Sequence, residues 1–251
     1  MSIHYKTSPH FVAYLDLLAG KSLIRTREDE SLNQLHSLLQ VAKESCSHNN
    51  KALFPSCKVK IFSDNIIISC KLTGKIERDL PKINSAISLI SAIQIVGMEM
   101  YHYLFRGGAT IGNLFIDDVM VWGNALVRAN ELEETLAVYP RIVIDNPLLD
   151  MLSADKDVIE KDYSKYSISL DQDNMYYLDY LKAYFKLSLT PESRSEFLAD
   201  NYIYYKEKLP SEFDKVRQKL SWQVLYLEKY IESNNEKLVT CEQIKESSVA
   251  R

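Results

Sequence analysis

The chain has 251 residues, of which 46% are apolar and 25% are charged, with only 7 glycines and 7 prolines. This composition is typical of a globular protein with one domain, or with one domain and an extension. The formal net charge of −4 argues against a general nucleic-acid binder, which normally carries a basic surplus. No apolar run reaches the roughly 18 residues of a membrane span, and the first residues lack the apolar stretch of a secretory signal. We therefore expect no nucleic-acid partner and no membrane association.

The four cysteines, Cys46, Cys57, Cys70 and Cys241, are scattered without a CxxC pair. Their spacing indicates neither a zinc site nor a disulfide scaffold. We therefore expect reduced thiols and a cytoplasmic protein.

The first 145 residues alternate apolar β-rich runs with segments that have helical spacing. The predicted strands are residues 11–15, 58–62, 66–68 and 141–145, with a further hairpin over 105–122. The predicted helices cover residues 31–45, 81–103 and 124–136. Ser63-Asp64-Asn65 favours a tight turn between two of the strands, and Pro81 is expected to open the second helix.

This order predicts an α+β protein in which helices pack on one mixed sheet, with a ferredoxin-like core. Residues 151–165 are acidic and are expected to form a loop, and residues 166–180 are expected to supply two more strands. From Pro191 to about residue 235 the pattern is helical, broken at Pro210, and a polar tail covers 236–251. We expect a catalytic domain over 1–180 and a helical extension, 181–251, packed on the same domain.

Two aspartates are the first candidates for chemistry. Asp16 closes an apolar strand, where it either faces a ligand at the sheet end or, more commonly, caps a helix. Asp64 lies in a turn, where aspartate is usually only a turn former. If strands 11–15 and 58–62 are neighbours, both carboxylates meet at one sheet end. Two such acids can hold divalent ions with the phosphates of a nucleotide, and a metal pair can assist phosphoryl displacement.

Three of the seven glycines, Gly107, Gly108 and Gly112, fall within one predicted strand. Glycine in a strand marks the close approach of a ligand or of another backbone. A tightly packed or bulged strand explains the same pattern equally well. The spacing matches neither GxxxxGK[ST] nor GxGxxG, so it is not a phosphate loop.

Taken together, these residues resemble the catalytic domain of class III nucleotidyl cyclases and, more closely, the bacterial Pycsar pyrimidine cyclases. The resemblance covers residues 10–180, with its blocks in the same order. The blocks are FVAYLDLLAG, FSDNIIIS, FRGGATIGNLF, WGNALVRANELEE and YPRIVID.

The resemblance implies a head-to-tail homodimer with active sites shared between protomers. It implies that Asp16, Asp64 and the backbone carbonyl of Leu17 bind two Mg²⁺ or Mn²⁺ ions. The ribose 3′-hydroxyl of a nucleoside triphosphate would then attack its own α-phosphate and expel diphosphate. Metal ions at that position lower the pKa of the attacking hydroxyl and neutralise developing charge.

The base-reading positions depart from the purine cyclase pattern. Lys60 stands at the position of the base-reading lysine, but Met120 stands where an aspartate is usual. A methionine cannot accept a strong hydrogen bond from the amino group of adenine. Arg106 is either a contact to the base or phosphates or a salt bridge that fixes the hairpin or the dimer.

The positions that stabilise the transition state in class III cyclases also depart from the usual pattern. Val127 and Glu131 occupy the positions of the usual asparagine and arginine. Asn124 and Arg128 have the same spacing one turn earlier and share a helix face. They are the candidate substitutes, although an exposed helix arginine is as often only a surface charge.

The resemblance favours a uridylate cyclase that converts UTP to cyclic UMP, a signal sensed by a separate effector protein in antiphage defence. Lys60 favours UTP, because the uracil O4 accepts a hydrogen bond where the cytosine N4 donates one. The alternatives are a cytidylate cyclase, a catalytically silent nucleotide-binding dimer module, and a scaffold that binds a partner through its C-terminal helices.

Overall fold

The structure is a computed structural model that describes residues 4–49, 57–187 and 189–233. The chain divides into two compact units, Met1–Ala183 and Tyr184–Arg251. This boundary lies close to the predicted one at 180/181, whereas the packing of the extension on the domain stays a prediction. The predicted polar tail, 236–251, lies outside the described residues.

The strands and helices follow the predicted order. The strands are β1 (Ser8–Leu17), β2 (Cys57–Phe62), β3 (Asn65–Lys71), β4 (Phe105–Ile116), β5 (Val121–Trp122), β6 (Ile142–Ile144), β7 (Ile168–Leu170) and β8 (Tyr176–Leu178). The helices are α1 (Gly20–Thr26), α2 (Glu28–Asn49), α3 (Ile76–Tyr101), α4 (Asn124–Thr135), α5 (Asn146–Ser153), α6 (Tyr180–Tyr184), α7 (Pro191–Lys208) and α8 (Asp214–Ser233), with 3₁₀ turns at Ser164–Tyr166 and Leu209–Ser211.

The sheet has the strand order β2-β3-β1-β4-β6-β8-β7, and β5 pairs with β4. Its first four strands pair antiparallel, whereas β6 runs parallel to β4. A split β-α-β-β-α-β chain with β1 between β3 and β4 is the ferredoxin-like arrangement. The predicted α+β class and ferredoxin-like core are therefore confirmed.

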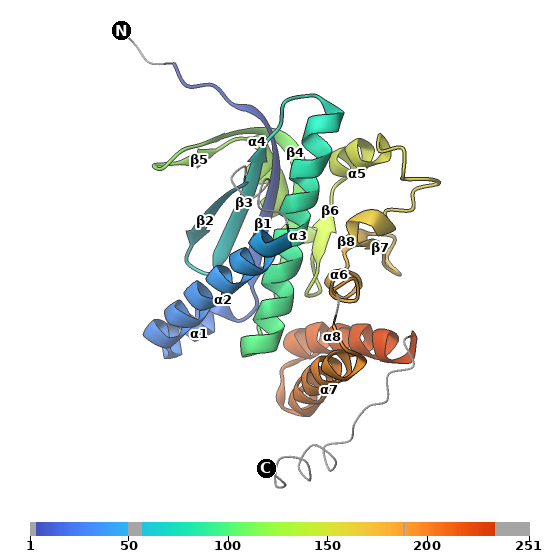
Figure 1. The fold of residues 1–251 in the computed structure, drawn as a ribbon. Helices are drawn as coiled ribbons and strands as arrows, with labels where there is room; N and C mark the ends of the chain where they lie inside the picture. Colours follow the sequence, from blue (N-terminus) through green and yellow to red (C-terminus); the bar gives the residue numbers. More distant parts are fainter. Residues whose placement is uncertain (1–3, 50–56, 188, 234–251) are drawn as a thin grey trace. The chain divides into compact units, whose positions relative to one another are not determined.

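The central strand β1 buries both of its faces because side chains alternate along a strand. Phe11, Ala13 and Leu15 join the main core with residues of α2 and α3, which lie against each other over the sheet (Figure 1). Val12 faces the other way and packs with Ala125 and other residues of α4. The two faces explain why the run 11–15 is continuously apolar.

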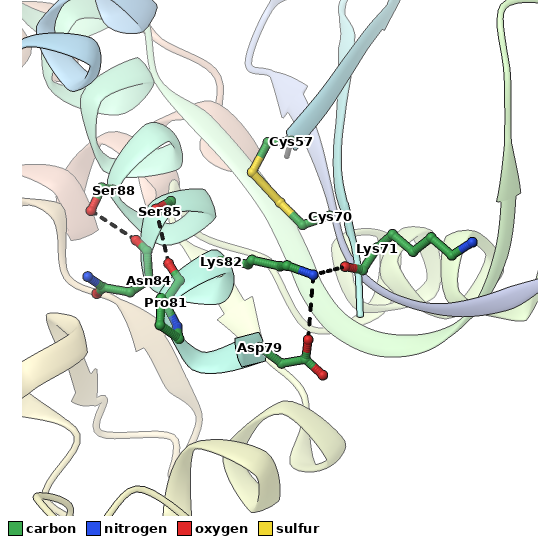
Figure 2. Close-up of a disulfide and its surroundings, with 9 residues drawn as sticks. All are labelled: Cys57, Cys70, Lys71, Asp79, Pro81, Lys82, Asn84, Ser85 and Ser88. Atoms are coloured by element: carbon green, nitrogen blue, oxygen red, sulfur yellow. Dashed lines mark hydrogen bonds and ion pairs between the residues drawn. A yellow bond between two sulfur atoms is a disulfide. The ribbon is translucent and has the colours of Figure 1, made fainter. Parts of the chain in front are cut away.

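Helix α3 is long and apolar enough to cross a membrane, but 72% of its most apolar stretch is buried. It is therefore a core helix of this domain. It begins at Ile76, so the prediction that Pro81 opens it was wrong. The reason lies in Asp79, which precedes Pro81 in the helix (Figure 2): it accepts hydrogen bonds from the backbone of Thr73 (2.9 Å) and Gly74 (2.8 Å), and this turn starts the helix before the proline.

Two further expectations were wrong in detail. Residues 151–153 belong to α5 and not to a loop, because Leu148, Leu149 and Leu152 are buried and hold that helix against the domain. Cys57 and Cys70 form a disulfide across the β2–β3 hairpin, with a Cα–Cα distance of 4.5 Å (Figure 2). That distance is typical of directly opposed residues on antiparallel strands. The spacing of cysteines along the sequence does not reveal such a pairing. Disulfides are uncommon in reducing compartments, and the cytoplasmic location stays a prediction.

The glycines of β4 serve packing. A Cβ on Gly107 would lie 2.1 Å from the carbonyl oxygen of Tyr14, and one on Gly108 would lie 2.3 Å from the Cβ of Leu132 in α4. These distances are far below van der Waals contact, so the backbones of β1 and β4 and helix α4 approach closely only with glycine there. The packing interpretation of the glycine cluster is therefore supported.

We predict that Gly108→Ala destabilises the domain by about 1–3 kcal/mol, because the added methyl overpacks the contact with α4. Gly112→Ala is the matched control, since its Cβ would lie 3.2 Å from Ala125 and requires only a small adjustment. Urea denaturation followed by circular dichroism measures both free energies of unfolding. Equal stability of the two variants would contradict the packing role of Gly108.

Candidate active site

Asp16 and Asp64 lie side by side at one end of the sheet. Asp16 is in β1 and pairs with Asn65 of β3 and with Arg106 of β4. Asp64 is the turn residue directly before Asn65, and its carbonyl oxygen accepts a hydrogen bond of 3.0 Å from the amide of Leu17. The expectation that β2 would be the neighbour of β1 was wrong, because β3 lies between them. The two acids still meet, because the β2–β3 turn delivers Asp64 to the strand that pairs with β1.

Asp16 does not cap a helix. Helix α1 begins at Gly20, and its N-cap residue is Ala19, with a φ of 64° and no side-chain cap. The interpretation of Asp16 as an N-cap was therefore wrong. Its carboxylate is left to interact with the groups at the sheet end.

Arg106 links Asp16 to a third acid. Its Nε donates a hydrogen bond of 3.2 Å to Oδ2 of Asp16, and its guanidinium pairs with Glu133 of α4. Glu133 is itself buried. Ala125, Ala129 and Leu132 form the buried face of α4, and the helical position of Glu133 beside Ala129 was the signal that it faces the sheet.

This end of the sheet favours a positive charge. Burial raises the pKa of Asp16 above its ordinary value, with Arg106 opposing that shift and the charge of Asp64 adding to it. Burial also raises the pKa of Tyr14 to about 12, and the charges of Glu133, Asp16 and Asp64 contribute to that shift. The carboxylates therefore stand within electrostatic reach of one another, and one arginine only partly neutralises them.

The donor set fits a hard divalent cation. Carboxylate and carbonyl oxygens are the ligands that Mg²⁺ and Mn²⁺ prefer. Gly20 lets its backbone pack directly against Asp64, since a Cβ there would lie 2.7 Å from Oδ2 of Asp64. Within the described ranges, no group of three or more His, Cys, Asp and Glu side chains forms a complete metal centre. A cation held by Asp16 and Asp64 would therefore need backbone and substrate oxygens as well.

Lys60 and Met120 belong to a second cluster. Lys60 of β2 donates a hydrogen bond of 3.4 Å to the carbonyl oxygen of Asp118, and its Nζ lies 3.8 Å from Oδ1 of the same residue. Met120 follows in the same β4–β5 turn and lines an open cavity of about 640 Å³ with Phe115 and Trp122. The two residues predicted to read the base therefore flank one turn.

Arg128 forms an ion pair with the buried carboxylate of Asp145, while its own side chain stays partly exposed. Its Nε and Nη2 donate to Asp145 at 3.0 and 2.8 Å, and the hydroxyl of Thr110 donates to the same carboxylate at 2.8 Å. Burial of Asp145 opposes ionisation, but the hydrogen bonds from Arg128 and Thr110 outweigh it and lower the pKa of Asp145. Arg128 is thus more than a surface charge. Asn124 is the first residue of the same helix, α4.

Comparison with known proteins yields structural likeness only. No protein-family model matches the chain, and no curated protein matches it. The guanylyl cyclase domain of the RhoGC fusion protein from Blastocladiella emersonii is 14% identical, covers 69% of this chain and 98% of its own, and has a TM-score of 0.45. The guanylate cyclase domain of RhGC from Catenaria anguillulae, in complex with GTP, is 12% identical over 60% of this chain and 85% of its own, with a TM-score of 0.42. An adenylate/guanylate cyclase/hydrolase from Silicibacter pomeroyi is 14% identical over 69% of this chain and 95% of its own, with a TM-score of 0.42.

The two arginines allow a matched test of the site's electrostatics. We predict that Arg106→Gln raises the pKa of Asp16 by about one pH unit or more, because it removes the cation that opposes burial. Arg128→Gln should raise the pKa of Asp145 instead and leave Asp16 unchanged. Carbon-detected NMR of the side-chain carboxyl groups measures both titrations. An unchanged pKa of Asp16 in Arg106→Gln would show that this pair is not formed in solution.

Proposed function

We propose that this protein is a nucleotidyl cyclase, which converts a nucleoside triphosphate to a 3′,5′-cyclic monophosphate and diphosphate. The observation that carries the proposal is the convergence of Asp16 and Asp64, 48 positions apart in the sequence, at one partly buried sheet end where their charges favour a cation. The resemblance of five sequence blocks to class III cyclases supports the same function.

Each residue at this sheet end has a proposed part in the reaction. Asp16, Asp64 and the carbonyl of Leu17 would hold Mg²⁺ or Mn²⁺, and these ions would lower the pKa of the 3′-hydroxyl and neutralise charge on the phosphates. Arg106 positions Asp16 through its 3.2 Å hydrogen bond, and Glu133 holds Arg106 from the opposite side. The chain's contribution is therefore orientation of the carboxylates before substrate arrives.

The proposed substrate is a pyrimidine nucleotide, with UTP favoured over CTP. Met120 supplies no strong acceptor for an adenine amino group. Lys60 is a donor that suits the uracil O4, once it leaves Asp118. The same resemblance supports a role for cyclic UMP as an antiphage signal that a separate effector protein senses.

The proposed active unit is a homodimer with shared sites. Several large apolar side chains are exposed near the base-reading cluster, including Phe62 (77%), Trp122 (68%) and Val127 (57%). Exposed apolar residues of this kind are typical of protein interfaces. In such a dimer, Lys60 and Met120 of one protomer would serve the acid pair of the other. Arg128 or Asn124 of that first protomer would stabilise the developing charge.

Incubation of the purified protein with Mn²⁺ and each of the four nucleoside triphosphates should yield one main cyclic product, cyclic UMP. Asp64→Asn should lower turnover by at least about 100-fold, because it removes one charged ligand of the metal pair. Asp150→Asn, which removes an exposed acid of α5, should retain wild-type turnover. Liquid chromatography with mass spectrometry identifies the products. Cyclic CMP would indicate the cytidylate alternative, and nucleotide binding without any product would indicate the silent module.

Mixing two inactive variants tests whether the sites are shared. Asp64→Asn and Lys60→Ala each damage a different half of the proposed site. Equal mixing and subunit exchange should restore about a quarter of wild-type turnover, since half of the dimers are mixed and each has one intact site. Native mass spectrometry confirms that subunits have exchanged. If turnover does not recover although they have, both halves of the site lie in one protomer.

A further inference from the structure

We propose that a second cavity, at the opposite end of β1 from Asp16, binds a phosphoryl dianion. The cavity has a volume of about 270 Å³ and is lined by residues of the chain before β1 and of β1, β2, β3 and β4. It lies where β1 begins, at Ser8 and His10, whereas the acid pair lies where β1 ends. The proposal does not depend on the cyclase activity.

Cationic side chains from three segments line this cavity. Lys6 precedes β1, Lys58 is in β2 and Lys71 ends β3. The strand register brings the last two together, because His10 pairs with Lys71, and Lys58 pairs with Ser69, two residues before Lys71 on the same face of β3. Among the described residues that line the cavity, none is an aspartate or a glutamate. An anion entering here would meet lysines without a competing carboxylate in the wall.

A buried hydroxyl in the wall lacks a hydrogen-bond partner. Ser69 is 1% exposed, and its Oγ is one of the buried side-chain atoms that make no hydrogen bond in the described part of the chain. Buried polar groups are almost always paired, so an unpaired hydroxyl that lines a cavity indicates a missing partner. A phosphoryl oxygen would accept its hydrogen bond.

His10 lies in the same wall as these lysines. His10 is buried, and burial lowers its pKa, with the charges of Lys71 and Lys58 lowering it further. Its Nδ1 bonds with the carbonyl of Ser8 at 2.7 Å, which leaves Nε2 as its second hydrogen-bonding atom. A bound anion would offset these positive charges and favour the charged imidazole.

The side chain of Lys58 and the backbone of Lys71 are held in place before a ligand arrives. Lys58 donates a hydrogen bond of 3.0 Å to the carbonyl of Ile116. Lys71 extends its side chain away from Lys82 and the disulfide, while its carbonyl accepts a hydrogen bond of 2.9 Å from Lys82 (Figure 2). The Cys57–Cys70 disulfide joins the two strands next to both lysines. This arrangement lowers the cost of ordering the site on binding.

A dianion fits better than a monovalent ligand because several lysines and a hydroxyl donor line the cavity, and charge-assisted hydrogen bonds are the stronger kind. The source of the phosphoryl group is either free phosphate or an organic phosphate monoester. The neighbouring cavity beside Trp122 shares Lys6 and Phe115 with this one and offers an aromatic surface to the organic part of a monoester.

The test titrates the protein with inorganic phosphate and with phenyl phosphate at low ionic strength, followed by NMR of the backbone amides and the His10 ring. We expect saturable binding and a rise in the pKa of His10. Lys71→Gln should weaken phosphate binding about tenfold, the effect of one charge-assisted hydrogen bond. Lys75→Gln removes the same charge from an exposed residue outside the cavity and should bind like the wild type.

Ser69→Ala changes no charge and should also weaken binding. Equal affinities of Lys71→Gln and Lys75→Gln, or of Ser69→Ala and the wild type, would overturn the proposal, as would an unshifted His10 titration. Tighter binding of phenyl phosphate than of phosphate would identify a monoester as the source, and equal binding would identify free phosphate. Both of the last outcomes support a phosphoryl site.

Discussion

The antiparallel pairing of β1 with β3 on one side and β4 on the other is the constraint on which the rest of this domain depends. It places Asp16 beside Asn65 and Arg106 at one end of the strand. At the other end it places His10 beside Lys71. Because β1 is buried on both faces, its register cannot slip without exposing its apolar side chains. The register of this one strand therefore sets the geometry of both proposed sites.

The two ends of β1 carry opposite charge. Three acids and one arginine gather where the strand ends, and burial raises the pKa of Asp16, so an added cation is favoured there. Lysines and a histidine with a lowered pKa gather where the strand begins, and there an added anion is favoured. The net charge of −4 conceals this separation. Local placement, more than total charge, decides what such a domain binds.

Several errors in the sequence-based expectations share one cause, which is that they concern contacts between segments far apart in the chain. Hydrophobic spacing identified β1, the β2–β3 hairpin and α4. It did not reveal that Glu133 turns toward Arg106, nor that Cys57 lies opposite Cys70, since each depends on the register of another element. The start of α3 was misplaced because Asp79 holds a turn ahead of Pro81. The glycines of β4 are explained by the approach of α4, and no ligand is needed to account for them.

By itself, the sequence determined the α+β class, the order of strands and helices, and Asp16 and Asp64 as candidate residues, because periodicity and turn chemistry are local properties. Only the tertiary structure decided that β3 separates β1 from β2, that Arg128 is held by Asp145, and that lysines of three segments line one cavity. Strand order and register bring together residues that are dozens of positions apart. Those contacts arise from burial and pairing of the whole sheet, which no single segment specifies.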